Sequence, residues 1–449
     1  VTGSRWPTGG LVLDRLAVQT RALQLSGSAR VAGDGLPDAF DLNVLIAGED
    51  GRPILLPMGG GRTWLRRGEI ALAFDAATDS GWKGSASLLG LETDGLRLGN
   101  ARIAGSGRIA RVAGRNTFGG TLEFDATGIA LADLAMQKAV GPSLSGSTVL
   151  SFRQGSGALA LRQLELTGED YGATGSLEIE GLESGLMTGG RITLTAADLS
   201  RFGDLAGMDL GGSGTVVLDG QASRLSGAFD VVIEAVTRGL RTGIAQADRL
   251  TRGETRLARP AMRDEAGGAL RSLDLTAGGL ALTAGGKLSS KGSDLKGQVT
   301  LADLSALDPQ WGGGLVAEAS FTGTPGNGQL GLSGQGRHLR IGQADVDRLL
   351  AGQTAVSATV ATRGDGFFLT SAKLDGANLQ AEAKGTAGSD ELQVTGRLRD
   401  LSLLVAGYPG PVSLSGRLTP TGDGATMDLR LMGPAAIDTR VAGRISGTT

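Results

Sequence analysis

Side chains that could carry out chemistry are few and scattered in this chain. Its 449 residues include a single histidine, His338, and no cysteine, which excludes nearly all zinc sites and most nucleophilic triads. We interpret His338 as a surface residue at the start of an expected strand. The acidic pairs Glu169-Asp170 and Asp264-Glu265 could be drawn as glycosidase carboxylates. Nothing in the sequence places either pair across a cleft, so we expect solvated turns.

Two glycine-rich segments match ligand-binding motifs in residue spacing alone. Gly326-x-Gly328-x-x-Gly331 has the dinucleotide spacing, but an apparent strand follows it where the motif needs a helix, so we predict a hairpin turn. Gly211-Gly212-x-Gly214 begins like a calcium-binding nonapeptide, yet Val216 replaces the required Asp. We interpret this segment and Gly364-Asp365-Gly366 as connectors between strands, and Gly59-Gly60-Gly61 as a loop. The sequence therefore predicts no catalytic residue, no metal ligand, no cofactor and no enzymatic activity.

Seven arginines gather between residues 238 and 263, where Asp248 and Glu254 are the acidic residues. One interpretation is a solvated, irregular insertion. The other is a rim that attracts anionic head groups or cell-wall polymer, at about 1 kcal/mol per cation near an anionic surface. The candidate head-group residues are Arg249, Arg252 and Arg256.

Composition limits the protein class. The net charge is −3, with basic and acidic residues interspersed, which argues against nucleic-acid binding. Glycine supplies 77 residues, well above the usual share of about 7%, and aromatic residues supply 4%. This composition is typical of many short strands joined by tight turns. The lack of cysteine is compatible with an oxidising compartment. No apolar run reaches the roughly 18 residues of a spanning helix, and the first residue is Val1, so we expect a piece of a longer protein.

The elements that position these side chains recur about every hundred residues. Asp198-Leu199-Ser200 returns at 303–305 and 400–402, and Asp248-Arg249-Leu250-x-x-Gly253-x-Thr255 returns at 347–354. Such periodicity indicates stacked units that bury their apolar faces against one another. We therefore divide one continuous elongated domain into a degenerate β repeat at 1–120 and repeats at 121–220, 221–320 and 321–449. The third repeat contains the basic insertion 238–263.

Strand signals are nearly continuous, and helical signals are short. Apolar residues alternate with polar or small ones, which predicts an antiparallel meander with one apolar face. Residues 131–140 and 344–351 predict short helices, and the Asp-Leu-Ser segments predict single turns, all at the rims of the sheet. We expect an all-β sheet curled into a U-shaped groove, because the helices are too few to cover it and the aromatic residues too few to fill a thick core. The expected wall residues are Leu164, Leu166, Leu177, Ile179, Ile192, Leu194, Leu273, Leu275, Leu280, Leu282, Val299, Leu301, Leu330, Leu332, Leu339, Ile341, Leu392 and Val394.

The sequence resembles a known family. The segment from Gly297 through Asp303-Leu304-Ser305 to Gly334, and its continuation from Leu339 to Gly352, resemble the middle region of the TamB proteins of the AsmA-like envelope group. The resemblance covers the chain, most clearly over 160–449. It implies a β-taco in the periplasm of Gram-negative bacteria, with a parent protein anchored in the inner membrane and an outer-membrane partner like TamA. The anchor and the region that would meet this partner are not recognised in the sequence.

The resemblance implies passive transport of phospholipid along the groove towards the outer membrane. The alternative is a scaffold for outer-membrane protein assembly, which holds unfolded strands by β-augmentation. A third possibility is a stalk or adhesin with a filled core and no groove. Phospholipid acyl chains are the expected ligand of the first hypothesis, and polypeptide that of the second.

Overall fold

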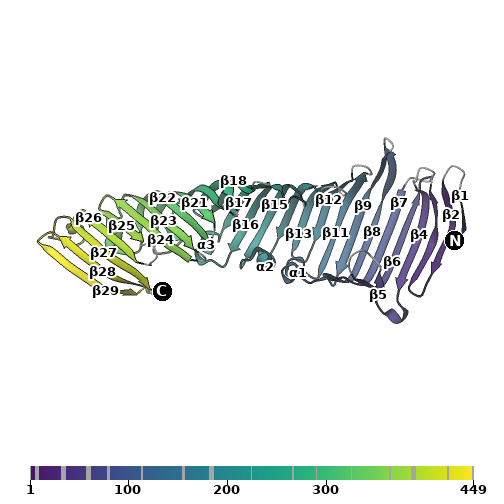
Figure 1. Ribbon diagram of the computed structural model, residues 1–449, viewed down its shortest axis with the longest axis horizontal. Helices are drawn as coiled ribbons and strands as arrows, with labels where there is room; N and C mark the ends of the chain where they lie inside the picture. The colour runs from purple at the N-terminus through teal and green to yellow at the C-terminus, as the bar shows by residue number, and fades with distance from the viewer. Residues whose placement is uncertain are drawn as a thin grey trace. The chain divides into compact units, whose positions relative to one another are not determined.

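The computed structural model describes residues 2–5, 10–31, 37–56, 62–77, 81–112, 115–153, 157–181, 187–223, 225–264, 267–289, 291–324, 326–363, 366–385, 391–421 and 424–446. Over these residues, 29 strands belong to an antiparallel sheet, and the helical elements are short (Figure 1). The expectation of an all-β antiparallel sheet with a few short helices is confirmed. The chain divides into two compact units, Val1–Val232 and Ile233–Thr449, which we describe separately.

Unit 1 is a meander of hairpins. From β1 to β15, each strand pairs with the next one along the chain, with three exceptions. Strand β4 pairs with β6, β5 also pairs with β6, and β10 pairs back with β8 while β9 pairs with β11. Strand β16 (Phe229–Arg241) contains the boundary between the units. The strands of unit 1 are β1 (Thr2–Arg5), β2 (Leu11–Gln19), β3 (Leu23–Val31), β4 (Pro37–Ala47), β5 (Ile54–Leu56), β6 (Thr63–Asp75), β7 (Gly81–Glu92), β8 (Leu96–Val112), β9 (Arg115–Thr127), β10 (Ala130–Leu131), β11 (Ser143–Arg153), β12 (Ala158–Thr167), β13 (Tyr171–Glu180), β14 (Met187–Ala196) and β15 (Gly211–Ser223).

Unit 2 continues the same plan, with every strand from β17 to β29 paired to its sequence neighbour. The strands are β17 (Glu254–Asp264), β18 (Gly267–Ala277), β19 (Leu280–Leu288), β20 (Ser293–Leu301), β21 (Gly312–Thr324), β22 (Asn327–Arg340), β23 (Gln353–Arg363), β24 (Gly366–Gly376), β25 (Leu379–Gly385), β26 (Leu392–Leu398), β27 (Val412–Thr421), β28 (Gly424–Gly433) and β29 (Ile437–Ser446).

Short helical elements follow particular strands. In unit 1 they are η1 (Glu49–Gly51), α1 (Leu134–Val140), η2 (Leu199–Phe202) and α2 (Gly203–Ala206), and in unit 2 they are α3 (Ala245–Leu250), η3 (Leu304–Ala306), α4 (Ala344–Leu349) and η4 (Leu401–Leu403). The predicted helix at 131–140 begins three residues late because Asp133 caps it. The predicted helix at 344–351 ends two residues early, at Leu349.

The Asp-Leu-Ser segments form single turns, as predicted. The carboxylates of Asp198, Asp303 and Asp400 each accept a hydrogen bond from the backbone N–H two residues later, at 2.9, 2.9 and 3.0 Å. This is N-capping by a short acidic side chain. The Ser305 N–H lowers the pKa of Asp303 below its ordinary value, and the N–H groups of Gly410 and Ser402 lower the pKa of Asp400 in the same way.

Two expectations about connectors were wrong. Residues 238–263 are not an irregular insertion: they form the end of β16, helix α3 and nearly all of β17. Gly211-Gly212-Ser213-Gly214 is not a turn, because these residues open β15 and pair through Gly214 with Ala196. The hairpin predicted at Gly326 is confirmed, since Thr324 pairs with Asn327. The loop Gly59-Gly60-Gly61 and the Gly364-Asp365 turn lie outside the described residues.

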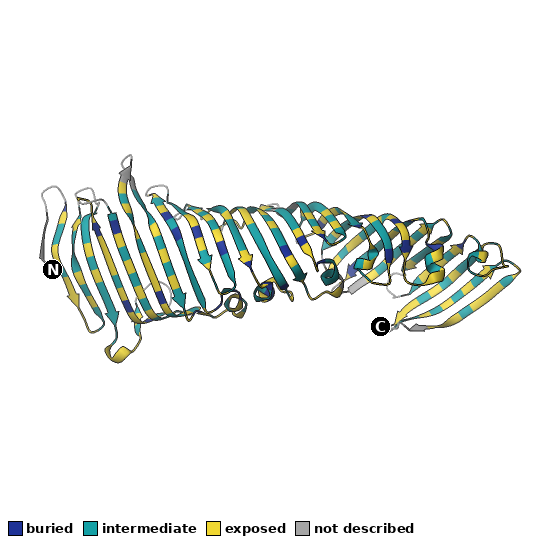
Figure 2. Cartoon of the chain, turned by 180° about the vertical axis from the view of Figure 1, so that it is seen from behind, coloured by how far each residue is buried: buried dark blue, intermediate teal, exposed yellow. Residues whose placement is uncertain are grey.

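The two faces of the sheet differ in exposure. Along strands such as β13 and β28, half-buried apolar residues alternate with exposed polar ones, and Figure 2 shows the resulting bands. The apolar face carries mostly Leu, Val, Ile, Ala and Gly, while the other face carries ion pairs such as Arg440–Asp428 and Arg430–Asp438. We call these the apolar face and the polar face of each unit.

Bulges and glycines bend the strands at matching places. A bulge between Leu161 and Leu164 in β12 brings Leu164 opposite Gly175, which has φ +157°. A bulge between residues 270 and 273 in β18 lies opposite Gly286, with φ +141°. A Cβ at either glycine would collide with a backbone carbonyl oxygen of the following strand. Bulges and glycine kinks of this kind curve a sheet, and only glycine fits both the φ and the close approach.

Candidate apolar groove

The predicted wall residues of unit 1 share one face. Leu164 pairs with Gly175 of β13, which pairs in turn with Ile192 of β14. In the same way, Leu166 pairs with Ala173, which pairs with Leu194. Directly paired residues, and residues two apart along a strand, project to the same side of a sheet. Leu177 and Ile179 follow Gly175 at this spacing on β13, so all six predicted residues of unit 1 lie on the apolar face.

The same holds for the strands of unit 2. Leu282 pairs with Leu275 and Val299, and Leu280 pairs with Leu301. Leu332 connects through three alanines, on β23, β24 and β25, to Val394 on β26. Strand spacing then places the other predicted residues of these strands on the same face, namely Leu273, Leu330 and Leu392.

The last two predicted wall residues differ. Leu339 reaches the apolar face through a bulge, because His338 has a positive φ of 49° and the leucine side chain lies over Gly336. Ile341 lies beyond the end of β22 and is 42% exposed, so the expectation that it continues the strand was wrong. Its N–H instead donates to the Asp347 carboxylate at 2.7 Å, which ties the strand end to α4.

The apolar face is only partly covered. Of the predicted wall residues, Leu164, Leu301 and Leu339 are buried, most others are half-buried, and Leu330 retains 40% exposure. Leu72, Ile103 and Leu218 on the same face also keep about 40%. A filled sandwich core would bury such residues almost completely. Over the described residues, neighbouring strands provide this partial burial and no second layer completes it.

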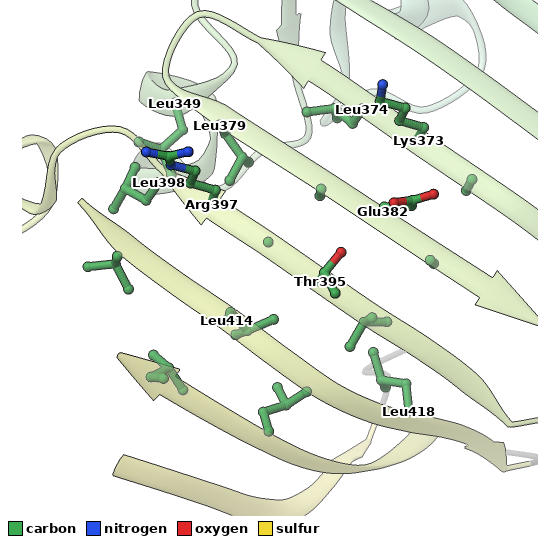
Figure 3. Close-up of a pocket in the computed structure, with 18 of the residues that line it drawn as sticks. Leu349, Lys373, Leu374, Leu379, Glu382, Thr395, Arg397, Leu398, Leu414 and Leu418 are labelled. Atoms are coloured by element: carbon green, nitrogen blue, oxygen red, sulfur yellow. The ribbon is translucent and has the colours of Figure 1, made fainter. Parts of the chain in front are cut away.

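A groove of about 650 Å³ lies on the apolar face of unit 2, over β23 to β28 (Figure 3). Rim leucines from helical elements close one end, and Figure 3 shows Leu349 beside Leu379 and Leu398 there. Of the predicted wall residues, Val394 is the one that lines this groove. The main lining side chains are Leu349, Val356, Leu374, Leu379, Val394, Leu398, Leu401, Leu404, Val412, Leu414, Leu418, Leu429 and Leu431.

Charged residues also border this groove, but their side chains belong to the polar face. Lys373 pairs with Glu382, which pairs with Thr395, and Gln380 pairs with Arg397. Each is one residue away from an apolar-face leucine, valine or alanine, so its side chain projects to the other side. The floor of the groove therefore offers no charge, and it suits a hydrocarbon chain.

The polar face is hollowed elsewhere. In unit 1, a hollow of about 440 Å³ over β3 to β8 is lined by Glu69 and Arg102 among small polar residues. In unit 2, a hollow of about 910 Å³ over β19 to β23 is lined by Lys296, Gln298 and Glu318. Of these three hollows, the one over β23 to β28 has the apolar lining.

Two of the three predicted head-group arginines, Arg249 and Arg256, make contacts within the protein. Arg249 of α3 donates from Nη1 to the Leu307 carbonyl at 2.6 Å, just after η3. Arg348, at the matching place in the repeat, donates to the Leu403 carbonyl of η4 at 2.7 Å. Arg256 pairs with Glu254 at 2.6 Å. Arg252 is exposed, and the described residues offer it no hydrogen bond or ion pair.

The acidic pair Glu169-Asp170 is not merely solvated. Both carboxylates face Arg201, whose side chain is 11% exposed, and Asp170 makes the closer contact. The Arg201 guanidinium also lies 4.9 Å from the centre of the Tyr171 ring. Burial raises the pKa of Tyr171, although the positive charge of Arg201 opposes the shift. We interpret this cluster as structural, because it fastens η2 to the ends of β12 and β13.

The remaining candidates are His338 and the pair Asp264-Glu265. His338 is exposed and serves the bulge in β22. The Asp264 side chain and Glu265 lie outside the described residues. Where the chain is described, no three acidic or histidine side chains gather closely enough to bind a metal ion.

Comparison with known proteins adds no identity. The chain matches no family model, and no curated protein is significantly similar to it in sequence. Among the helices of the described residues, none has the length and hydrophobicity needed to traverse a bilayer. The arrangement of the apolar face is therefore the main guide to function.

Proposed function

We propose that the apolar face binds acyl chains and lets phospholipid move along the protein without entering water. The observation that carries this proposal is the open leucine-lined groove over β23 to β28, on a face that stays half-exposed in both units. Each methylene moved from water to an apolar wall gains about 0.8 kcal/mol. Moving between equivalent apolar positions changes little, so the mechanism needs no catalytic group.

A curl of the sheet around this face is part of the proposal. It is supported by the strand bulges that lie opposite the positive-φ glycines Gly175 in unit 1 and Gly286 in unit 2. Curvature would shelter acyl chains on the concave side and leave head groups at the edge. Of the three predicted head-group residues, Arg252 is the one available for this task. Arg249 and Arg256 are engaged by Leu307 and Glu254.

The TamB-like motifs supply the biological setting of the proposal. They suggest a periplasmic segment of a protein anchored in the inner membrane, which passes phospholipid to the outer membrane with a TamA-like partner. Anchor and partner contact would then belong to other regions of the parent protein. The rival proposal is a scaffold that holds unfolded outer-membrane strands by β-augmentation.

A pair of substitutions on β19 tests the proposal. Leu282→Arg introduces a charge on the apolar face, and Thr283→Arg introduces the same charge on the exposed polar face one residue later. The measurement is phospholipid transfer between donor and acceptor vesicles, with circular dichroism to verify folding. We expect transfer to fall for Leu282→Arg alone.

Each alternative gives a different outcome. If both folded variants transfer lipid like the parent chain but Leu282→Arg loses binding of unfolded outer-membrane polypeptide, the scaffold is correct. If Leu282→Arg unfolds the protein, the face is a filled core, because the new charge is buried without a partner.

A further inference from the structure

Aromatic side chains fill one part of the apolar face of unit 1. Trp82 on β7 is 6% exposed, and Phe74, its direct partner on β6, is 5% exposed. The Trp82 ring stacks on Phe118 with centroids 4.9 Å apart and an interplanar angle of 17°. Phe40 continues the cluster, 5.5 Å from Phe74. This part of the face is closed by the protein's own side chains.

The indole of Trp82 lies across a floor made of glycine. A Cβ added at Gly105, Gly107 or Gly120 would come within 2.9, 2.6 or 2.5 Å of ring atoms. The floor crosses β8 and β9, so the ring covers strands other than its own. The indole Nε1 donates a hydrogen bond to the Gly119 carbonyl, at 3.0 Å.

The same face is open directly beside the indole. Leu72 pairs with Gly84, and Ile103 pairs with Ala86, both on the strand that carries Trp82. Leu72 and Ile103 retain 40% and 41% exposure. A hydrocarbon chain lying on these two side chains would end against the Trp82 ring. The open apolar surface is therefore interrupted by the aromatic cluster, in which the Trp82 ring lies over glycines of β8 and β9.

We propose that Trp82 is a displaceable closure of the apolar face, which leaves its glycine floor when an acyl chain occupies unit 1. This inference rests on the proposed function. An acyl chain can replace the apolar contacts of the indole with Gly105, Gly107 and Gly120, and the released Nε1 can donate to water. The glycine floor makes the exchange sterically simple, because no side chain has to follow the indole.

The test uses tryptophan emission. Replacing Trp6, Trp64 and Trp311 with Phe leaves Trp82 as the single indole of the full chain. Stearate is titrated into this variant, and the emission maximum and quenching by acrylamide are recorded. Binding of radiolabelled stearate is measured in parallel. The matched control retains Trp64 alone, which lies near the start of neighbouring β6, pairs with Glu92 and is 40% exposed.

We expect stearate to shift the Trp82 emission to the red and to remove its protection from acrylamide, while Trp64 emission stays unchanged. Stearate that binds while Trp82 remains blue-shifted and protected would overturn the inference and leave the proposed function intact. No stearate binding by either variant would overturn both.

A second variant covers the possibility that the triple substitution disturbs the fold. Trp82→Phe in the otherwise unchanged chain keeps an aromatic ring but removes the hydrogen bond to Gly119. We expect this variant to bind more stearate per chain than the unsubstituted protein, because the Phe ring is smaller than the indole and lacks its hydrogen bond. Equal stoichiometry would contradict a closing role for Trp82.

Discussion

Leu414 lies near the middle of the groove and allows a sharp test of the groove as a binding site. It is half-buried on β27, paired with Gly396 on one side and Leu431 on the other. Leu414→Asp introduces a carboxylate on the apolar face, within the lining of the groove. Ser415→Asp introduces the same charge on the exposed polar face of the same strand, where Ser415 pairs with Arg430.

The expected size of the effect follows from transfer of hydrocarbon. If the carboxylate keeps about four methylenes of a bound chain in water, at about 0.8 kcal/mol each, binding weakens by about 3 kcal/mol. That is on the order of a hundredfold in Kd. Folding should survive, since Leu414 is only half-buried and the new charge stays in contact with water.

The assay is titration of a fluorescent fatty acid into each purified variant, with circular dichroism melts alongside. The account expects a large loss of affinity for Leu414→Asp and little change for Ser415→Asp. Equal losses in the two variants would refute the assignment of faces. Unfolding of Leu414→Asp alone would refute the open groove, because only a closed core makes that site intolerant of charge.

Three further predictions concern the devices that shape the sheet and its rim. Gly286→Ala should destabilise unit 2 by about 2 kcal/mol or more in urea unfolding, because the added Cβ would meet the Asp294 carbonyl and Gly286 has a φ of +141°. Gly292→Ala, which has open space around the added Cβ, should cost clearly less. An equal cost would contradict the need for glycine at position 286. Arg249→Ala should lower stability by about 1 kcal/mol through the lost bond to Leu307, whereas Arg252→Ala should leave the melting temperature unchanged. The lowered pKa of Asp303 means that its cap stabilises η3 above the ordinary aspartate pKa and is lost as pH falls through the depressed folded value. Protection of the Ser305 amide from hydrogen exchange, relative to an unstructured peptide at the same pH, should therefore decrease in acid, and an Asp303→Asn variant that keeps the same acid dependence would refute this cause.

Sequence reasoning found the apolar face because strand periodicity is local. An alternation such as Leu280-x-Leu282 fixes which residues share a side, whatever the strand pairs with. The Asp-Leu-Ser turns were also predictable, because an aspartate two residues before a free N–H is a local capping signal. Of the eighteen residues, Ile341 does not continue the strand as expected, since β22 ends at Arg340 and the Ile341 N–H donates to the Asp347 carboxylate.

The groove itself was harder to predict. Leu414 and Leu429 show the same alternation as the predicted wall residues, so the signal for them is present in the sequence. Leu401 and Leu404 carry no such signal, because their contribution depends on where a turn after β26 packs against the sheet. The closure by Trp82 depends on glycines of two other strands, and only pairing brings these together.

The prediction of an irregular insertion at 238–263 was wrong because a high density of charged residues is also typical of loops. The helix of this segment shares the Asp-Arg-Leu motif with residues 347–349, and that repeat was the better guide to its structure. The arginine of the motif acts at a distance in sequence. It donates a hydrogen bond to the turn that follows four strands later, at Leu307 or Leu403. Periodicity therefore outweighs local composition in a repeat of this kind.

Photo-crosslinking in living Gram-negative cells, the setting proposed above, tests the central claim most directly. A photoreactive amino acid is placed in the parent protein at Leu332 or Leu414 on the apolar face, and at Ser333 or Ser415 on the polar face as matched controls. The account predicts phospholipid adducts from the two leucine positions and none from the two serine positions. Polypeptide adducts from the leucine positions, or lipid adducts from both faces alike, would contradict it.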